Sequence, residues 1–294
     1  MGINANLSIA ELPDPLSGAR NVMLVVLDSL RYDAWIAAEP KNLGRLGTVE
    51  RRFSYATWTA PSHHCMLMNL LPHIVMPADL TVSEYYRSEA VKFWDRIGIS
   101  GKLPDEVVSA LFLPTYFRSI GYQTRALVTM NVLNPSSAIN KDFGSYEMVG
   151  REDVDQIIDQ VQFDEHRPTF YMINVGLTHY PYTLPGEDTS QYPNLFGLNG
   201  ALKALRGAPS ADAEHAPRIL SRAEMAAAKE RQIGSLSYMD DFFGRLFEKV
   251  PQNTYLIVTS DHGELFGEDG LFGHGPYSHE KVLEVPFVEG IVPG

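Results

Sequence analysis

The stretch Tyr255-Leu256-Ile257-Val258-Thr259-Ser260-Asp261-His262-Gly263-Glu264 joins an apolar run to an Asp-His pair. The apolar half is typical of a buried strand, and the pair follows directly where that strand would end. A carboxylate and an imidazole at one strand end are ligands that a catalytic divalent metal accepts. The stretch therefore predicts a strand of a central sheet and part of a metal site.

A second strand end supplies another carboxylate. Residues 21–27 read Asn-Val-Met-Leu-Val-Val-Leu and end at Asp28. In an open parallel sheet, ligands bind at the carboxyl ends of the strands. Asp28 and the Asp261-His262 pair are therefore expected to converge on one edge of the sheet.

A hydroxyl group completes the predicted ligand set. Thr59 precedes Ala60-Pro61, and Pro61 suits the first turn of a helix, where its missing N–H costs nothing. Thr59 would then lie at or just before the helix start, close to free backbone N–H groups and the positive end of the helix dipole. Metal coordination would lower the pKa of this hydroxyl and make it a nucleophile. The predicted metal site, with three oxygen ligands and one nitrogen ligand, consists of Asp28, Thr59, Asp261 and His262.

Two histidines are further candidates for catalysis. His179 ends the segment Asn174-Val175-Gly176-Leu177-Thr178-His179, just past an apolar run, where it can donate to a substrate oxygen or protonate a leaving group. His274 is flanked by Gly273 and Gly275, which let the backbone approach a ligand closely. Arg31 is expected to pair with a nearby aspartate and to serve the structure.

Strand-like runs alternate with helical patterns along the chain. The strand-like runs are residues 22–27, 124–129, 169–175 and 255–259. The helical patterns are residues 61–70, 104–120, 153–162 and 222–250. Near-continuous apolar strands separated by helices predict an α/β fold with a mostly parallel central sheet sandwiched by helices.

The chain is expected to form one large domain. Its 294 residues can bury a full core, and its composition, with 45% hydrophobic and 20% charged residues, is ordinary for a globular protein. We expect an irregular lead-in over residues 1–20 and a single domain over 21–294. Insertions interrupt the alternation at about 73–103 and 183–219, and the second of these is expected to be a lid.

Charge and composition exclude some partners. The net charge of −12 argues against nucleic acid, which needs a basic surface, and requires that any anionic substrate be attracted by local charges. The single cysteine, Cys65, fits a reducing compartment. The sequence has neither a signal peptide nor an apolar run of about 18 residues. We expect a cytoplasmic protein without a membrane partner, and the oligomeric state is left open.

Several segments together resemble the alkaline phosphatase/sulfatase superfamily, and the sulfatase-like branch most closely. They follow the order of that family and span nearly all of residues 20–294. They are Asn21–Arg31, Thr57–Pro72, Phe117–Thr129, Thr178–Tyr182, Tyr238–Asp241, Thr259–Glu264, Gly273–Gly275 and Val285–Phe287.

The resemblance implies a role for each candidate residue. It implies that Asp28, Asp261 and His262 bind metal and that Thr59 is both nucleophile and ligand. His179 falls on the position that contacts substrate oxygens or assists the leaving group. His274 stands where many sulfatases and phosphonate monoester hydrolases have a lysine.

Departures from the family pattern narrow the expected chemistry. Classical sulfatases carry Cys or Ser, oxidised to formylglycine, within Cys/Ser-x-Pro-x-Arg, whereas this chain reads Thr59-Ala60-Pro61-Ser62-His63. Threonine cannot become formylglycine, and His63 replaces the arginine. Ser29 replaces a frequent second acidic ligand. Sulfatases also continue past Val285-Pro286-Phe287 into a smaller C-terminal subdomain, which is therefore expected to be reduced or absent.

We therefore expect a metal-dependent hydrolase of phosphate or phosphonate esters with a threonine nucleophile. Its substrate would be a small anionic ester, and its cofactor one divalent ion: Zn, Mn or Mg. A phosphotransferase or mutase that forms the same phospho-threonine is one alternative. A catalytically silent relative that binds an anion is the other.

Overall fold

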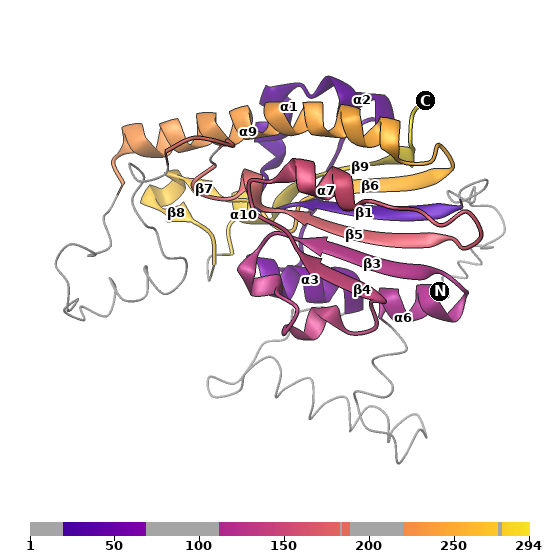
Figure 1. The fold of residues 1–294 in the computed structure, drawn as a ribbon. Helices are drawn as coiled ribbons and strands as arrows, with labels where there is room; N and C mark the ends of the chain where they lie inside the picture. Colours follow the sequence, from indigo (N-terminus) through magenta and orange to yellow (C-terminus); the bar gives the residue numbers. More distant parts are fainter. Residues whose placement is uncertain (1–19, 69–111, 183, 189–219, 276–277) are drawn as a thin grey trace, which may run out of the picture.

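The computed structural model describes residues 20–68, 112–182, 184–188, 220–275 and 278–294. Over these residues a seven-stranded sheet is covered by helices on both faces (Figure 1). The strands, in sheet order, are β2 (Glu50–Phe53), β9 (Glu284–Ile291), β6 (Thr254–Thr259), β1 (Asn21–Leu27), β5 (Thr169–Val175), β3 (Gln123–Val128) and β4 (Ser145–Met148). The expected α/β fold is confirmed.

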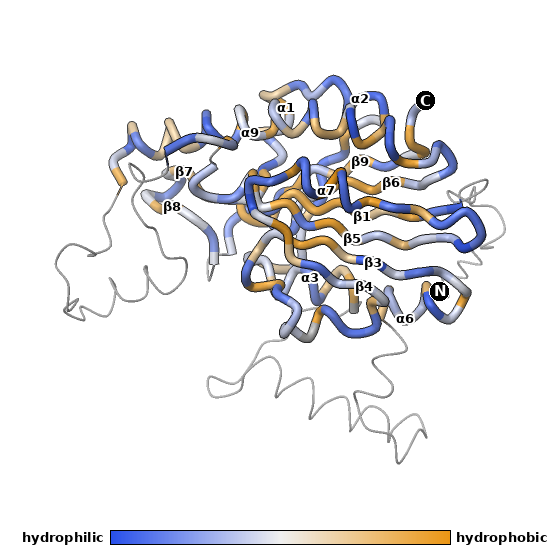
Figure 2. The backbone as a smooth tube through the Cα atoms, in the orientation of Figure 1, coloured by the Kyte–Doolittle hydropathy of each residue, from blue (hydrophilic) through white to orange (hydrophobic). Residues whose placement is uncertain are grey.

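The centre of the sheet is parallel and one edge is antiparallel. β1 lies between β5 and β6 and runs parallel to both, and β3 runs parallel to β5 and β4. β9 is antiparallel to β6 and to β2. Every residue of β1 and β5 is buried, which explains why these strands read as continuous apolar runs. They form part of the hydrophobic band through the middle of the molecule in Figure 2.

Helices cover the two faces unequally. One face carries α1 (Tyr32–Ala38), α2 (Lys41–Leu46), α7 (Val154–Gln160) and the long α9 (Arg222–Lys249), and the other carries α3 (Thr59–Met68) and α6 (Leu113–Ser119) (Figure 1). Trp35 and Phe243 belong to the core of the first face. On the second face Phe117 stacks on Phe170, with ring centroids 4.4 Å apart. Each face of the sheet therefore buries its own hydrophobic core.

The sequence predicted the four central strands and the helices at 61–70, 153–162 and 222–250 to within a few residues. Of the helix expected at 104–120, residues 104–111 lie outside the described residues, and α6 spans Leu113–Ser119. The elements β2, β4, β9, α1 and α2 were not predicted. β2 is fully exposed and β4 is short and half-exposed, so neither shows a buried apolar run. Pro286 lies inside β9, and a proline argues against a strand in the sequence because it lacks the N–H that a ladder hydrogen bond needs.

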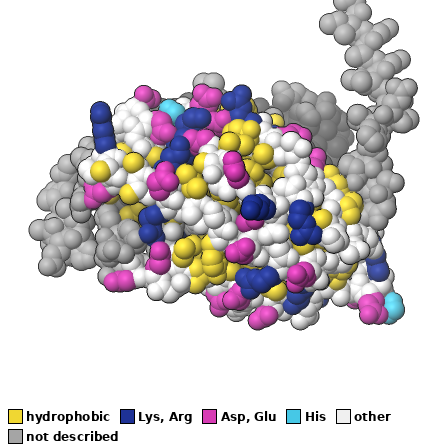
Figure 3. All heavy atoms as spheres, turned by 90° about the horizontal axis from the view of Figure 1, so that it is seen from above, with side chains coloured by type: hydrophobic (Ala, Val, Ile, Leu, Met, Phe, Trp, Pro, Cys, Tyr) yellow, Lys and Arg dark blue, Asp and Glu magenta, His cyan; other side chains and the backbone are white. Residues whose placement is uncertain are grey.

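Some expectations concern residues outside the described part of the chain. These are the lead-in, apart from residue 20, the insertion at 73–103 and nearly all of the insertion at 183–219. The reduced C-terminal subdomain also remains a prediction. No described helix has the length and apolar character needed to cross a membrane. Acidic, basic and apolar side chains are interspersed on the face formed by α9, α1 and α2 (Figure 3).

α9 begins with a capping box, and its N-terminal part extends beyond the central sheet. The Ser221 side chain accepts from the Glu224 backbone N–H, and Glu224 accepts from the Ser221 N–H. The N-terminal half of α9 extends past the strand ends, over the two-stranded sheet of β7 (Leu265–Phe266) and β8 (Phe272–Gly273) (Figure 1). This small sheet and α10 (Glu280–Leu283) lie near the carboxyl edge of the central strands.

Asp240 of α9 is predicted to hold α2 in place. Its carboxylate accepts from the backbone N–H groups of Asn42 and Leu43, each at 2.9 Å, and thereby satisfies the open N-terminus of α2. Asp240→Ala should lower the free energy of unfolding by about 1–3 kcal/mol, measured by urea denaturation. The exposed neighbour Asp241 is the control, and Asp241→Ala should change stability by less than about 0.5 kcal/mol. Equal effects of the two substitutions would contradict this role.

Candidate metal centre

The predicted ligands meet at the carboxyl edge of the sheet. Asp28 follows β1, and the Asp261-His262 pair follows β6, the neighbouring parallel strand. A carboxylate oxygen of each aspartate and a ring nitrogen of His262 lie within 4.8 Å of one another. All three side chains are at most 1% exposed. The convergence expected from the strand ends is therefore present in the structure.

Thr59 also lies next to these three side chains. It is the first residue of α3, and its Oγ1 lies 3.4 Å from Asp28 Oδ1 and 3.4 Å from His262 Nε2. His262 Nε2 is also 3.4 Å from Asp261 Oδ2. Ligand atoms around one tetrahedral ion with bonds of about 2.0–2.2 Å are separated by about 3.3–3.6 Å. Three separations among these side chains match that range, and the fourth, from His262 Nε2 to Asp28 Oδ1, is somewhat longer at 3.9 Å.

The tautomer of His262 also fits a metal ligand. Its Nδ1 lies 2.9 Å from the Gly263 carbonyl oxygen, which can only accept, so Nδ1 carries the hydrogen. Nε2 is then the nitrogen with a free lone pair, and it faces Asp261 and Thr59. Burial lowers the pKa of His262 to about 3, so the ring is neutral at physiological pH. A neutral imidazole oriented by a backbone carbonyl is the usual form of a metal-bound histidine.

The two carboxylates need a cation between them. Burial, followed by repulsion from Asp28, raises the pKa of Asp261 well above its ordinary value. Burial also raises the pKa of Asp28, but the surrounding histidines, His179 most strongly, outweigh it and lower that pKa to about 2. Asp261 Oδ2 is buried and has no hydrogen-bond partner in the part of the chain that the structure describes. A divalent ion would satisfy this oxygen and relieve the repulsion.

Neighbouring groups hold both carboxylates in position. Ser29 adopts a left-handed backbone conformation, with φ of 62°, and donates its N–H to Asp261 Oδ1 at 3.0 Å. Asn174 Nδ2 donates to Asp28 Oδ2 at 3.2 Å, which leaves Oδ1 facing Thr59. A Cβ at Gly263 would collide with the Lys281 carbonyl oxygen, so only glycine lets the chain after His262 pass so close to residue 281. The ligand atoms are thus oriented before any ion binds.

His63 lies behind this site. It is fully buried, and its Nδ1 donates to the Thr59 carbonyl at 2.8 Å. The same nitrogen is 3.8 Å from Asp261 Oδ2. Burial lowers the pKa of His63, so it adds no fixed positive charge where the family motif has arginine. Its contacts indicate that His63 supports the first turn of α3.

His179 and His274 also lie at this edge of the sheet. Their ring centroids are 5.1 Å apart, and the His274 ring is 4.2 Å from that of His262. Gly273 and Gly275 on either side of His274 have φ of 93° and 127°, so the loop needs the conformational freedom of both glycines. The structure therefore brings together all six site residues predicted from the sequence: Asp28, Thr59, His179, Asp261, His262 and His274.

A buried glutamate supports His274. Glu264 is 1% exposed; its Oε1 accepts from His274 Nδ1 at 2.7 Å and its Oε2 accepts from the Tyr182 hydroxyl at 2.8 Å. Burial alone would lower the pKa of His274, but Glu264 outweighs it and raises that pKa. The pKa of Glu264 is lowered by His274 against the effect of burial. The two side chains therefore form a buried ion pair beside the ligands.

Arg31 has the structural role expected for it. Its guanidinium is 2% exposed and pairs with Asp33 at 2.7 Å and Glu268 at 2.6 Å. It also donates to the Glu264 carbonyl at 3.1 Å. Arg31 is thus fully occupied, and its charge is not available to an anionic ligand.

Several residues that complete the site had no role predicted from the sequence: Asn174, Glu264, Tyr182, His63 and Arg151. Glu264 carried the strongest signal, since it lies two residues after His262 in the deciding stretch and is charged next to a buried strand. Asn174 stood inside an otherwise apolar strand, where a polar residue indicates a partner. Arg151 is in a loop after β4, a strand that the analysis missed.

Comparison with known proteins agrees with this fold. The chain matches the model of the Sulfatase family over residues 20–288. It therefore belongs to the sulfatase family, within the alkaline phosphatase superfamily. Members of this family are hydrolases or transferases, which identifies the chain as a member of an enzyme family.

Individual relatives are distant. An uncharacterized sulfatase, YidJ from Escherichia coli, is 22% identical over 161 residues, which cover 51% of this chain and 31% of YidJ. The chain thus spans about a third of the length of this curated relative. Phosphonate monoester hydrolase of Agrobacterium radiobacter has the same fold, with a TM-score of 0.56, 14% identity, and coverage of 92% of this chain and 68% of that one.

A third relative was solved with zinc. The C-terminal periplasmic domain of EptC from Escherichia coli, in complex with Zn, has a TM-score of 0.55 and 12% identity. The match covers 93% of this chain and 73% of that domain. At these identities the structural likeness establishes the fold, and the substrate must be argued from the residues themselves.

Asp261→Asn is predicted to separate metal binding from folding. Asn keeps the acceptor for Ser29 and replaces the unpartnered oxygen with an amide, so it removes both the ligand and the repulsion from Asp28. We expect the metal-free variant to melt at or above the temperature of the metal-free wild type. Added Zn or Mn should stabilise the wild type by about 2.7 kcal/mol at 100 times Kd and leave the variant unchanged.

The exposed Asp269 provides the matched control for this experiment. Asp269→Asn, 78% exposed in the side chain, should keep the full metal-induced rise in melting temperature. A full metal-induced rise in Asp261→Asn would show that the ion binds elsewhere.

Proposed function

We propose that this chain is a metal-dependent hydrolase of small phosphate or phosphonate esters with Thr59 as its nucleophile. The observation that supports it most strongly is the position of Thr59 Oγ1, 3.4 Å from both Asp28 Oδ1 and His262 Nε2 at the start of α3. The hydroxyl is 5% exposed and lies inside the ligand set. A threonine that only capped the helix would not require a position next to both Asp28 and His262.

The residues divide the chemistry between them. Asp28, Asp261, His262 and Thr59 would hold the divalent ion, which when bound supplies positive charge and lowers the pKa of the Thr59 hydroxyl. Thr59 Oγ attacks phosphorus, and the leaving oxygen departs with its electron pair. The N-terminus of α3 presents backbone N–H groups towards the anion. Water or an alcohol then attacks phosphorus and returns the electron pair to Thr59 Oγ.

His274 is the proton donor to the leaving oxygen in this proposal. Its Nδ1 is bound to the Glu264 carboxylate, which stabilises the imidazolium and fixes the ring. Nε2 is therefore the atom that can give a proton to the leaving group. The sequence left His179 and His274 as equal candidates, and the carboxylate behind His274 favours it.

Two features favour phosphorus esters over sulfate esters. Thr59 cannot be oxidised to formylglycine, and the arginine of the sulfatase motif is replaced by His63, which is buried behind the site. The same phospho-threonine would serve a phosphotransferase or mutase, and addition of alcohols followed by product analysis separates transfer from hydrolysis. A silent relative that only binds anions would show bound ligand without turnover.

The ligand set favours zinc or manganese over magnesium. An imidazole nitrogen suits transition metals, whereas magnesium prefers oxygen ligands and retains waters. The zinc complex of the EptC domain is consistent with this preference. We therefore propose one ion per chain at this centre, identified by elemental analysis of the purified protein.

Thr59→Val is predicted to abolish turnover without unfolding the protein. Valine keeps the shape of threonine and removes only the hydroxyl, so kcat/KM for nitrophenyl phosphate, phosphodiester and phosphonate esters should fall by about a thousandfold or more. Mass spectrometry of quenched wild type should find phosphate or phosphonate on Thr59. Thr59→Ser, which keeps a hydroxyl, should retain measurable activity.

This experiment also ranks the reaction classes. Turnover of the sulfate ester above the phosphorus esters would contradict the substrate class. Full activity in metal-loaded Thr59→Val would remove Thr59 as the nucleophile.

The loss of activity in His274→Gln is predicted to depend on the leaving group of the ester. An alkoxide needs a proton as it departs, whereas nitrophenolate is stable without one. The variant should therefore lose about 100-fold in kcat on an alkyl ester and much less on the matched nitrophenyl ester. Glu264→Gln should show the same selectivity to a smaller degree. Equal losses on both esters would assign His274 to binding or structure instead.

A further inference from the structure

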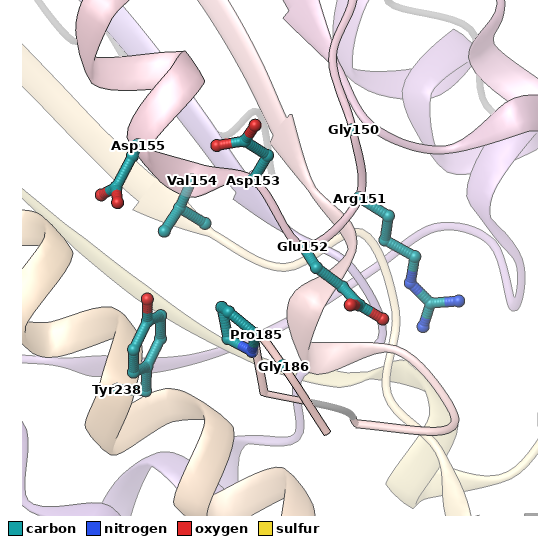
Figure 4. A pocket seen from close by; sticks show the side chains of 9 residues that line it. All are labelled: Gly150, Arg151, Glu152, Asp153, Val154, Asp155, Pro185, Gly186 and Tyr238. Carbon is teal, nitrogen blue, oxygen red and sulfur yellow. The ribbon is translucent and has the colours of Figure 1, made fainter. Parts of the chain in front are cut away.

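Arg151 lies between a surface cavity and the candidate metal centre. It belongs to the loop that joins β4 to α7, and this loop lines a cavity of about 480 Å³ together with Pro185, Gly186 and Tyr238. Figure 4 shows the Arg151 side chain directed away from Tyr238 and Pro185. It extends instead to the segment that follows β5 and carries His179.

One guanidinium binds several backbone carbonyls of that segment. Arg151 Nε donates to the Gly176 carbonyl at 3.0 Å, and Nη2 donates to the carbonyls of His179 and Tyr180. Gly176 is the first residue of the short helical turn η5 (Gly176–Thr178), and His179 and Tyr180 follow that turn. The planar fork of arginine can make such contacts together, and a lysine ammonium cannot reproduce their geometry.

Gly176 leaves room for the Arg151 stem. A Cβ at this position would lie 3.3 Å from Arg151 Cγ, 3.1 Å from Thr129 Oγ1 and 2.5 Å from Met130 Sδ. Glycine at the end of β5 therefore lets the arginine lie flat against the strand end. The contact is built into the fold and does not result from a flexible surface side chain.

Within the described ranges, no carboxylate forms an ion pair within 4.0 Å of the Arg151 guanidinium, in contrast to Arg31, which pairs with Asp33 and Glu268. Asp28, Glu152 and Glu264 act on the Arg151 charge without such an ion pair. Arg151 Nη2 is 3.5 Å from His179 Nδ1. A positive charge at this distance opposes protonation of the imidazole.

The hydrogen bonds of His179 define its tautomer. Nδ1 lies 2.9 Å from the Tyr180 carbonyl oxygen, which can only accept, and 3.5 Å from Arg151 Nη2, which can only donate. The shorter contact, with the Tyr180 carbonyl, assigns the hydrogen to Nδ1. In the neutral ring Nε2 is then a proton acceptor. His274 differs, because the charge behind it is the Glu264 carboxylate.

We infer that Arg151 is a positioning residue that holds the His179 turn and keeps His179 as the proton acceptor of this site. His179 Nε2 takes the proton of the incoming water or alcohol as its oxygen bonds to phosphorus. The bond from phosphorus to Thr59 Oγ breaks, and the electron pair returns to that oxygen. This inference rests on the proposed function, in which His274 serves the leaving group.

Four charged or titratable groups act on His179 from the surrounding elements. Burial lowers the pKa of His179; His274 and Arg151 lower it further, and Asp28 and Glu264 oppose them. Removal of Arg151 should therefore raise that pKa. A base works only when it is deprotonated, so its activity is lost as the pH falls through its pKa. The acid limb of the pH profile should move to higher pH when Arg151 is lost.

The test compares Arg151→Met and Arg151→Lys in the metal-loaded protein. Selective ¹⁵N-histidine NMR, with His179→Gln to assign the signal, reports the tautomer and titration of His179 without turnover. The pH dependence of kcat is measured on the ester that gives the highest turnover. Arg245→Met is the control, since Arg245 is exposed and pairs with Asp155 on α7.

In the wild type, ¹⁵N shifts at neutral pH should show His179 as the neutral ring protonated on Nδ1. Arg151→Met should raise its titration midpoint and shift the acid limb by the same amount. Arg151→Lys should keep the midpoint near that of the wild type and lose about tenfold in kcat, with little change in KM. Arg245→Met should resemble the wild type in both measurements.

Two results would overturn the inference. One is an Arg151→Met variant, or an Arg151→Lys variant if the first does not fold, with unchanged His179 signals and unchanged kcat. The other is a His179 that is protonated at neutral pH in the wild type. If no ester is turned over while the NMR results are as expected, the positioning role of Arg151 stands and the proposed function fails.

Discussion

Two buried carboxylates that face each other are the constraint on which the rest of the site depends. Asp28 and Asp261 end neighbouring parallel strands, and the register of β1 and β6 fixes how close they come. Asp261 Oδ2 is buried, and no group among the described residues donates to it. Such a pair is unfavourable unless a cation lies between its members. The neutral His262 and the hydroxyl of Thr59 lie where they would complete the coordination of such a cation.

The surrounding charges then give the two remaining histidines different environments. Glu264 lies behind His274, and Arg151 lies behind His179, so that opposite charges act on two rings 5.1 Å apart. Pairs of titratable groups whose surroundings shift their pKa values in opposite directions are typical of acid and base pairs in enzymes.

The sequence revealed those parts of the fold and the site that local patterns encode. Apolar runs located β1, β5 and β6, and polar residues at the ends of such runs located Asp28, His179 and the Asp261-His262 pair. The contacts of Arg151 could not be found in this way, because its loop follows an exposed strand and its partners are backbone carbonyls distant in sequence. Nor could the orientation of Asn174 towards Asp28 be read from a pattern, since it depends on the pairing of β1 with β5.

The central claim is that Asp28, Asp261, His262 and Thr59 hold one divalent ion, and anomalous diffraction tests it most directly. Crystals grown with zinc or manganese are measured at the absorption edge of the metal. The account predicts one strong peak within about 2.0–2.2 Å of Asp28 and Asp261 oxygens, His262 Nε2 and Thr59 Oγ1. A fully occupied ion elsewhere in the chain, with these four side chains bound only to one another or to water, would contradict it.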